Sequence, residues 1–353
     1  MGGGEVWMLR TLSELQKNGH DVSLLCRDDA EIKKIAQENG INVIVLNFGG
    51  ELNPFTIFKL VRLFIKKNVD IILTNMEKET RLCGIAAKIS SRGKLINRRG
   101  IDLPIKNNFR NKITYNKLTE KIITNSLATK NSLLKNIDWL NENKIDVVYN
   151  GINTSDYSES NTKNLREELK INQESKIIGF VGRLSPQKGI EYLVEAYTKI
   201  AEVYKDTCLL IVGEGELKEY CVAEFRKLNL SDKVIFTGFR KDIPNIMRTI
   251  DILVLPSLWE GFGIVLVEAM AAQKPCVASR ISSIPEIVIN GKTGILVDAK
   301  NSDALASALS TLLSDEVKRK EMGKNGQKLV DEKFSISKMI QSYERIFSEL
   351  LKN

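Results

Sequence analysis

Two glutamates flank a pair of glycines in residues 255–268, which read Leu-Pro-Ser-Leu-Trp-Glu-Gly-Phe-Gly-Ile-Val-Leu-Val-Glu. The apolar run at residues 252–255 ends at the start of this segment, and we expect a helix to begin near Gly263. Glu260 then lies in the connecting loop, and Glu268 lies near the second turn of the helix. Carboxylates are bidentate acceptors for sugar or ribose hydroxyls, and free amides at a helix start can receive a pyrophosphate without a metal. The pattern predicts a site for such a ligand, against the alternative of a helix with incidental glutamates.

A second loop carries two cations five residues apart. Residues 180–189 read Phe-Val-Gly-Arg-Leu-Ser-Pro-Gln-Lys-Gly, so that Arg183 and Lys188 follow the end of a strand-like run. A guanidinium fork and an ammonium can together neutralise a diphosphate and stabilise it as a leaving group. The alternative is a solvated basic loop.

A third candidate is the glycine run at residues 2–4, which directly precedes a helical pattern at residues 6–18. The free amides and the dipole of a helix start suit an anion, although the glycines could also be the flexible remnant of a tag. A domain of alternating strands and helices normally opens with a buried strand, and none precedes these glycines. We therefore expect the first strand to be missing, through an incompletely predicted gene or a truncated chain.

Short apolar runs and longer amphipathic segments alternate along the chain and provide the elements that position these loops. Strands separated by helices, with little internal alternation of their own, indicate parallel sheets covered on both faces, the doubly wound α/β class. Ligands of such sheets bind at the carboxyl ends of the strands. The expected strands are residues 21–26, 42–46, 70–74, 94–98, 121–124, 146–149, 177–181, 208–212, 234–237, 252–255, 276–279 and 294–297.

The alternation is interrupted once, by a polar stretch at residues 153–175. We expect two domains that face each other across a cleft, which suits the length of 353 residues. The predicted divisions are an N-terminal domain at residues 1–150, a linker at 151–175, a C-terminal domain at 176–333 and a helical segment at 334–353 that returns to the N-terminal domain.

Composition excludes several classes of protein. The five cysteines are scattered and the chain has one histidine, His20, so a disulfide framework, a zinc ribbon and a multi-histidine metal site are not expected. No apolar run approaches the roughly 18 residues that span a bilayer, and the N-terminus lacks the pattern of a signal peptide. We expect reduced, mostly buried thiols and a cytoplasmic protein.

The net charge of +8 is uneven along the chain. Residues 51–150 carry 19 basic and 9 acidic side chains, whereas residues 151–353 carry 28 of each. Such a surface attracts the phosphates of an anionic membrane or of a phosphorylated acceptor; the alternative is a solvated lysine-rich surface. Nucleic acid is not favoured, because interleaved aromatics and a recognised binding module are missing. Arg98 and Arg99 end a strand within this half and could contact phosphates or be surface charge.

The two loops together resemble the retaining glycosyltransferases of the large sucrose-synthase-like family 4, also called glycosyl transferases group 1, which have the GT-B fold of two Rossmann-like domains. The resemblance covers nearly the whole chain and is densest at residues 150–297. Further matching motifs, in the order of the family, lie at residues 2–5, 19–22, 149–152, 212–217, 237–239, 285–286 and 291–294.

The resemblance implies a catalytic set of Arg183 and Lys188, which would bind the donor diphosphate, and Glu260, which would bind the transferred sugar. Glu268 would hold the ribose of the nucleotide. The other donor-binding residues that it implies are Gly3, Gly4, Gly182, Gly213, Gly215, Gly238, Phe239, Arg240, Phe262, Gly263, Ile264 and Val265. The family needs no metal, which agrees with the absence of an Asp-x-Asp motif in the sequence.

The activity implied is transfer of a hexose from a UDP- or GDP-sugar to a saccharide or lipid-linked acceptor, in polysaccharide, lipopolysaccharide or glycolipid biosynthesis. The protein would be cytoplasmic, with peripheral contact at the inner membrane. Two departures are a missing cleft histidine, since His20 has a structural position, and Ser282-Ser283 where the family often has glycines before Glu286. Alternatives are a non-catalytic scaffold that binds sugar nucleotides and, less favoured for want of acid and base candidates, a GT-B epimerase.

Overall fold

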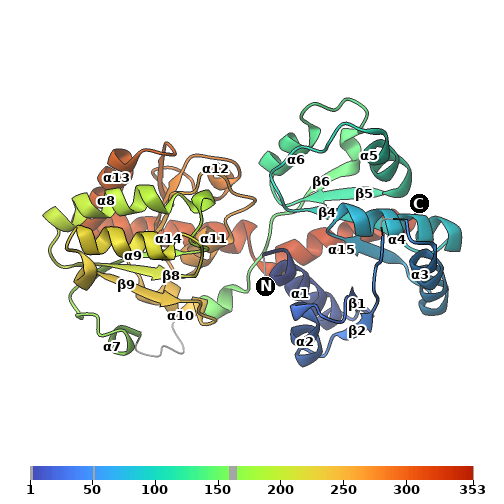
Figure 1. The fold of residues 1–353 in the computed structure, drawn as a ribbon, viewed down its shortest axis with the longest axis horizontal. Helices are drawn as coiled ribbons and strands as arrows, with labels where there is room; N and C mark the ends of the chain where they lie inside the picture. The colour runs from blue at the N-terminus through green and yellow to red at the C-terminus, as the bar shows by residue number, and fades with distance from the viewer. Residues whose placement is uncertain (1–2, 51, 159–164, 353) are drawn as a thin grey trace. The chain divides into compact units, whose positions relative to one another are not determined.

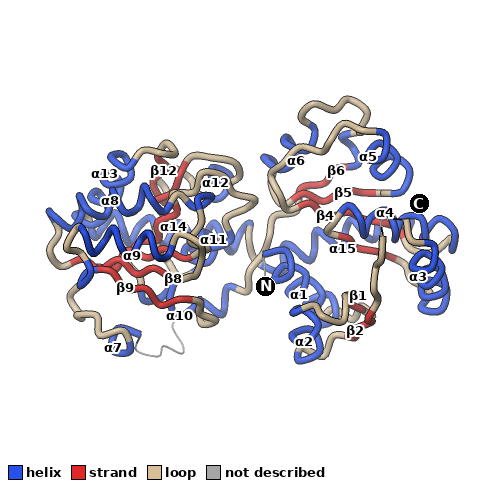
Figure 2. Tube along the Cα trace, in the orientation of Figure 1, coloured by secondary structure: helices blue, strands red, loops and turns tan. Residues whose placement is uncertain are grey.

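The computed structural model describes residues 3–50, 52–158 and 165–352, and the chain divides into two compact α/β units (Figure 1). Unit 1 is Met1–Asn150 with Ile336–Asn353, and unit 2 is Gly151–Ser335. Strands and helices alternate along both units (Figure 2). Every strand expected from the sequence is present, and its bounds shift by at most two residues.

Unit 1 carries its strands in two parallel sheets, β1-β2 and β3-β4-β5-β6. Its strands are β1 (Ser23–Cys26), β2 (Asn42–Val45), β3 (Ile71–Thr74), β4 (Lys94–Arg99), β5 (Lys121–Thr124) and β6 (Ile145–Val147). Its helices are α1 (Gly3–Lys17), α2 (Glu31–Glu38), α3 (Pro54–Lys67), α4 (Glu77–Ser90), α5 (Phe109–Ile113), α6 (Leu127–Leu134) and α15 (Ile336–Lys352), with a π-helical turn at Thr114–Leu118.

In the described part of unit 1, β1 and β3 belong to separate hydrogen-bonded ladders, and apolar side chains from both sheets contribute to shared clusters. Leu25 of β1 and Ile72 of β3 share one apolar cluster, and Val22 and Ile71 pack against another. Within the described residues, α1 is the first element, and no strand bridges β1 and β3.

The helical segment expected at the C-terminus is α15, and it completes the core of unit 1. Tyr343 and Phe347 are buried with Trp7 of α1, and the rings of Trp7 and Tyr343 lie 6.1 Å apart. His20 follows α1, and its Nε2 lies 3.2 Å from the Glu344 carboxylate of α15. The single histidine thus joins two helices of unit 1, which agrees with its structural interpretation.

Unit 2 is a six-stranded parallel sheet in the order β12-β11-β10-β7-β8-β9. Its strands are β7 (Lys176–Val181), β8 (Thr207–Val212), β9 (Val234–Gly238), β10 (Ile252–Leu255), β11 (Cys276–Ser279) and β12 (Gly294–Val297). Its helices are α7 (Leu165–Glu168), α8 (Ile190–Val203), α9 (Lys218–Lys227), α10 (Ile243–Thr249), α11 (Ile264–Ala271), α12 (Ile284–Ile287), α13 (Ser302–Ser314) and α14 (Glu316–Lys333). Every residue of β8, β10 and β11 is buried, as expected for strands covered on both faces.

The stretch expected as a linker, residues 151–175, groups with unit 2 where it is described. Tyr157 and Leu165 are buried there. Arg166 forms an ion pair with Asp251 at 3.6 Å, between its Nη2 and a carboxylate oxygen. This segment is polar in overall composition. A few apolar side chains and one largely buried arginine attach it to the rest of unit 2.

All five cysteines are free and buried, as the sequence analysis predicts. Burial raises the pKa of the Cys83 thiol to about 12 and that of the Cys208 thiol to about 11. In the described residues, no helix combines the length and apolar content needed to cross a bilayer.

The cysteines supply a first testable prediction. At pH 8 a thiol with its pKa raised by about two units has about 100-fold less thiolate than an ordinary one, and burial also blocks the reagent. We expect Ellman's reagent to react slowly with the native protein and rapidly with all five thiols in urea. Fast labelling of Cys83 or Cys208 in the native protein, located by mass spectrometry, would show that this burial is wrong.

Candidate functional site

The candidate loops of unit 2 leave the same edge of one sheet. β7 lies between β10 and β8, and these three strands are parallel. From β7 the chain builds β8 and β9 on one side of the sheet, and then β10, β11 and β12 on the other side. The strand order therefore reverses at β7, and open α/β sheets bind their ligands at such a point. The loops that follow β7 and β10 carry the cations and the glutamates that the sequence analysis selected.

Lys188 and Glu260 meet across these two loops. The Lys188 ammonium donates a hydrogen bond to Oε2 of Glu260, and the Ser257 hydroxyl donates to the same oxygen at 3.4 Å. The two charged side chains are only 15% and 10% exposed. The pair links the two loops. Removal of either side chain would leave the other charge buried and uncompensated, which costs free energy.

The backbone keeps the two loops together independently of this ion pair. The Leu258 amide donates to the carbonyl of Gln187 at 2.8 Å, and the Gln187 side chain donates to the carbonyl of Trp259 at 3.1 Å. Gly189, with φ of +59°, packs so closely that a Cβ there would lie 2.2 Å from the carbonyl oxygen of Pro256. The loop after β7 is therefore fixed against the loop after β10.

The loop after β8 packs against the other side of the loop after β7. A Cβ on Gly213 would lie 2.0 Å from the carbonyl oxygen of Gly182, and one on Gly215 would lie 2.1 Å from that of Leu184. The Leu184 amide donates to the carbonyl of Glu214 at 2.9 Å. This close approach of two backbones accounts for both glycines of the Gly-x-Gly motif; their contact with a nucleotide stays a prediction.

Arg183 lies between these fixed points. Its side chain is exposed, while Gly182 before it and Leu184 after it are both bonded to the strand or loop of β8. Within the described residues, the Arg183 guanidinium makes no ion pair or hydrogen bond. The backbone therefore holds this cation at the rim of the sheet, with its five N–H donors available to a ligand.

The end of β9 and the loop after it carry three of the predicted residues, Gly238, Phe239 and Arg240. Phe239 is 73% exposed. Arg240 instead is held by two carboxylates, Glu168 at 2.6 Å and Asp242 at 2.7 Å. The Arg240 guanidinium lowers the pKa of the Asp242 carboxyl below its usual value. A ligand that used Arg240 would have to share it with these acids.

The start of α11 combines a glycine cap with a buried glutamate. Gly263 is the N-cap residue with φ of +85°, and Ile264 and Val265 begin the helix, whose first amides have no intrahelical partner. Glu268 lies one turn later and is buried. The start of the helix and the position of Glu268 are those expected from the sequence, and their contact with a ligand stays a prediction.

Ser283 is a site-supporting residue that sequence reasoning missed. Its hydroxyl, fully buried, donates to the carbonyl of Phe262 at 3.0 Å and so anchors the loop that carries Glu260. The sequence analysis treated Ser282-Ser283 only as a departure from the family pattern. The sequence offered one clue to this role, the serine hydroxyl, because a serine that is buried needs a hydrogen-bond partner. The role of Glu286 stays a prediction.

Unit 1 holds the remaining predicted residues. Gly4 lies in the first turn of α1, where a Cβ would meet the Asn75 side chain at 2.7 Å, and Gly3 precedes it with open space around it. Arg99 lies 3.5 Å from the Glu77 carboxylate and donates to the carbonyl of Leu103 at 2.9 Å. Arg99 therefore has local partners in unit 1.

Arg98 is 5% exposed, which excludes the interpretation as surface charge for this residue. Its guanidinium lies 4.4 Å from the ring centre of Trp7 and donates to the Asn150 side-chain oxygen at 3.0 Å. Burial lowers the pKa of Arg98 below its usual value, while its hydrogen bond to Tyr343 opposes this shift. Within the described residues, its hydrogen-bond partners are neutral, so the contact with a phosphate stays a prediction.

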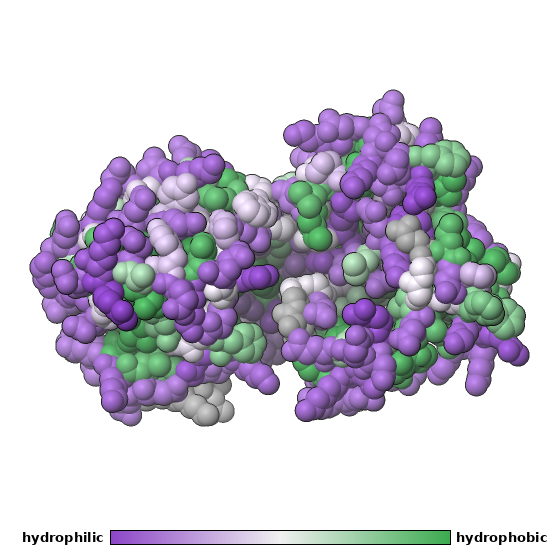
Figure 3. Space-filling view, in the orientation of Figure 1, coloured by the Kyte–Doolittle hydropathy of each residue, from purple (hydrophilic) through white to green (hydrophobic). Residues whose placement is uncertain are grey.

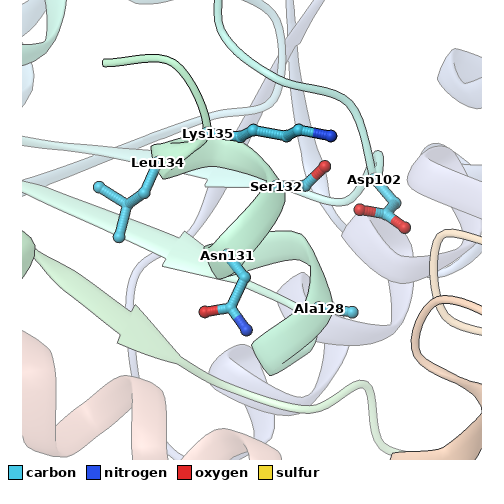
Figure 4. A pocket seen from close by; sticks show the side chains of 6 residues that line it. All are labelled: Asp102, Ala128, Asn131, Ser132, Leu134 and Lys135. Atoms are coloured by element: carbon cyan, nitrogen blue, oxygen red, sulfur yellow. The ribbon is translucent and has the colours of Figure 1, made fainter. Parts of the chain in front are cut away.

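A separate shallow pocket lies in unit 1 (Figure 4). Its lining comes from α6 and the loop after β4, and comprises Asp102, Ala128, Asn131, Ser132, Leu134 and Lys135. It shares none of the residues that the sequence analysis selected, and we assign it no function.

Two family models match the chain. Glycosyl transferases group 1 matches residues 161–329, and Glycosyltransferase Family 4 matches residues 1–156. An uncharacterized glycosyltransferase of Methanocaldococcus jannaschii is 38% identical over 200 residues, which are 55% of this chain and 51% of that protein. The match to this relative thus spans about half of its length.

A UDP-Gal:alpha-D-GlcNAc-diphosphoundecaprenol alpha-1,3-galactosyltransferase of Escherichia coli is 26% identical over 98% of this chain and 93% of its own. Among solved structures, Anabaena Alr3699/HepE in complex with UDP and glucose matches with a TM-score of 0.86 at 24% identity, over 99% of this chain and 96% of that one. The same protein in complex with UDP-glucose matches with a TM-score of 0.84. These likenesses confirm the GT-B fold.

The packing of the β8 loop yields a second prediction. In Gly215→Ala the new Cβ would collide with the Leu184 carbonyl, and backbone must move to relieve it. We expect a loss of about 1–3 kcal/mol in the free energy of unfolding and a fall of about 2–10 °C in melting temperature. Gly50→Ala, which meets no atom within 4 Å, is the control. Equal melting temperatures for the two variants would contradict the close approach.

Proposed function

The chain belongs to the glycosyl transferases group 1 of glycosyltransferase family 4, and from this premise we propose that it moves a hexose from a nucleoside diphosphate sugar to an acceptor hydroxyl with retention of anomeric configuration. The observation that carries the proposal is the buried pair of Lys188 and Glu260 at the strand-order reversal, with Arg183 exposed in the same loop as Lys188. Two cations and a carboxylate at the carboxyl ends of parallel strands suit a sugar diphosphate, which supports the proposal.

Lys188 and Arg183 would act on the diphosphate. The Lys188 ammonium has three donors, so it can keep its bond to Glu260 and still donate to a phosphate oxygen. Arg183 adds a planar fork that suits two oxygens at once. Negative charge grows on the phosphate as the sugar leaves, so cations fixed in advance stabilise the transition state more than the bound donor.

Glu260 and Glu268 would bind hydroxyls. Glu260, oriented by Lys188 and Ser257, would accept from the transferred sugar. Glu268 on α11 would accept from the ribose, and the amides of residues 262–265 would contact the phosphates. Gly182, Gly213, Gly215, Gly238 and Phe239 would line the nucleotide, and Gly3 and Gly4 would supply the glycine turn of unit 1.

The sugar transfer would proceed by attack on the same face from which the phosphate leaves. The bond between the anomeric carbon and the phosphate oxygen breaks, the bond to the acceptor oxygen forms, and the acceptor proton passes to the leaving phosphate. On this route Arg183, Lys188 and Glu260 contribute by orienting the donor and by stabilising charge. No carboxylate of the chain is needed as a nucleophile on this route.

The donor is a UDP- or GDP-sugar, and the UDP and UDP-glucose complexes of the Anabaena protein favour UDP. The acceptor is a saccharide or lipid-linked saccharide, for which the diphosphoundecaprenol-linked substrate in the name of the Escherichia coli relative provides the precedent. Polysaccharide, lipopolysaccharide or glycolipid assembly would use such a product.

The first test removes the charge pair. Lys188→Ala and Glu260→Ala should each lower kcat/KM for a UDP-sugar by about 100-fold or more, since the first removes a cation that stabilises the leaving phosphate and the second removes the carboxylate that holds the sugar. Release of UDP from a panel of UDP-sugars, with membrane extract as the acceptor source, is the measurement. Lys199→Ala is a matched control, because Lys199 forms an exposed ion pair with Asp303 on the outer helices.

Folding is checked separately, because loss of one partner also leaves a buried charge. Melting temperatures with and without UDP distinguish lost binding from lost folding, since a ligand of the folded state raises the melting temperature. Full activity in a folded Lys188→Ala protein would overturn the proposed role of this pair. UDP binding by the wild type without any turnover would favour the scaffold.

The second test concerns stereochemistry. With an α-linked donor, proton NMR of the first product formed should show the small anomeric coupling of an α-glycoside. A β-linked product at early times would contradict retention while leaving transferase activity in place.

A further inference from the structure

The outer face of α3 combines exposed apolar side chains with cations and lacks acids. Phe55, Phe58 and Ile65 are 78%, 58% and 55% exposed. Lys59, Arg62, Lys66 and Lys67 are also exposed on this helix, whose sequence contains no Asp or Glu. Figure 3 shows apolar side chains among hydrophilic ones over this part of unit 1. We call Phe55, Phe58, Lys59, Arg62, Ile65 and Lys66 the α3 face.

These residues form one stripe along the helix. Positions 55, 58, 59, 62, 65 and 66 recur at three- and four-residue spacing, so they share one side of an α-helix. The opposite side carries Leu60 and Phe64, both buried in an apolar cluster of unit 1. Other side chains of α3 therefore fill the core, and the apolar groups of the α3 face remain in contact with solvent.

The helix that presents this stripe is firmly bounded. The Asn53 side chain accepts from the Thr56 amide at 3.0 Å at the N-terminus, and Asn68 ends the helix in the left-handed conformation. The Arg62 guanidinium lies 5.3 Å from the ring centre of Phe58, which holds a cation beside an aromatic ring. In the part of the chain that the structure describes, none of the four α3 cations pairs with a carboxylate.

We propose that the α3 face docks unit 1 on the surface of an anionic lipid bilayer. Phe55, Phe58 and Ile65 would enter the boundary between headgroups and acyl chains, and the cations would contact lipid phosphates. The inference rests on the proposed function only in that a lipid-linked acceptor lies in such a membrane. It gives a function to four of the 19 basic residues of residues 51–150, which lie together on one helix.

The positive charge of the α3 face favours an anionic bilayer over a protein partner. A second copy of the chain would bring cations against cations, which is unfavourable. The core of an ordinary protein interface is depleted in lysine, whereas this face carries lysines among its apolar residues. An anionic bilayer satisfies both kinds of side chain, because lysine and arginine can extend to phosphates while aromatic rings insert.

The test is binding to vesicles of phosphatidylcholine with about 30% phosphatidylglycerol, measured by sedimentation without donor or acceptor. Wild-type protein should bind these vesicles, bind pure phosphatidylcholine far less, and dissociate as salt rises. Lys59→Gln with Arg62→Gln should lower the partition coefficient about 30-fold, since each cation near such a surface contributes about 1 kcal/mol. Phe55→Ser with Phe58→Ser should lower it at least about tenfold.

Matched controls come from α14 of unit 2. Lys324→Gln with Lys328→Gln removes the same net charge from exposed positions, and Val317→Ser removes an apolar side chain that is 77% exposed. Both should bind like wild type. Equal binding by the α3 variants and the controls, or binding indifferent to phosphatidylglycerol, would overturn the proposal.

Self-association is checked by sedimentation velocity, and a dimer that Phe55→Ser with Phe58→Ser dissociates would assign the face to a second copy instead. Because vesicle binding is measured without substrates, its failure leaves the proposed sugar transfer standing. Failure of turnover equally leaves the docking result standing.

Discussion

The contact that the candidate site depends on is the packing of the loop after β7 between the loops after β8 and β10. Gly213 and Gly215 permit it on one side and Gly189 on the other, each with a backbone carbonyl where a side chain would otherwise lie. Because strands in a parallel sheet end at one edge, this packing converts three separate segments into one rigid surface. Lys188 and Arg183 owe their positions to it.

The two units use charge in different ways. In unit 2, Lys188 and Arg240 are neutralised by carboxylates, and Arg183 is exposed between fixed backbone groups. In unit 1, Arg98 is buried among neutral partners, while the cations of α3 are exposed. The exposed cations of unit 1 can attract an anionic surface, whereas most of the cations in the candidate site of unit 2 are already paired.

The strands were predictable because buried parallel strands leave short apolar runs that few other structures produce. The glutamate and lysine motifs were equally visible, since glycines and charged residues directly after such runs indicate ligand loops. Ser283 escaped notice because its partner is a backbone carbonyl of another loop, about 20 positions earlier in the chain. A sequence pattern relates residues that are near one another along the chain, whereas this hydrogen bond joins two residues that meet only in space.

The sequence by itself determined the order of strands and helices, the α/β class and the excess of cations in one half, and it selected the loops that we propose bind a sugar diphosphate. The tertiary structure alone decided that Lys188 pairs with Glu260, that Arg98 is buried while Arg183 is exposed, and that the cations and phenylalanines of α3 are exposed together. The physical reason is that spacing and propensity act along the chain, whereas pairing and burial depend on which segments the fold brings together.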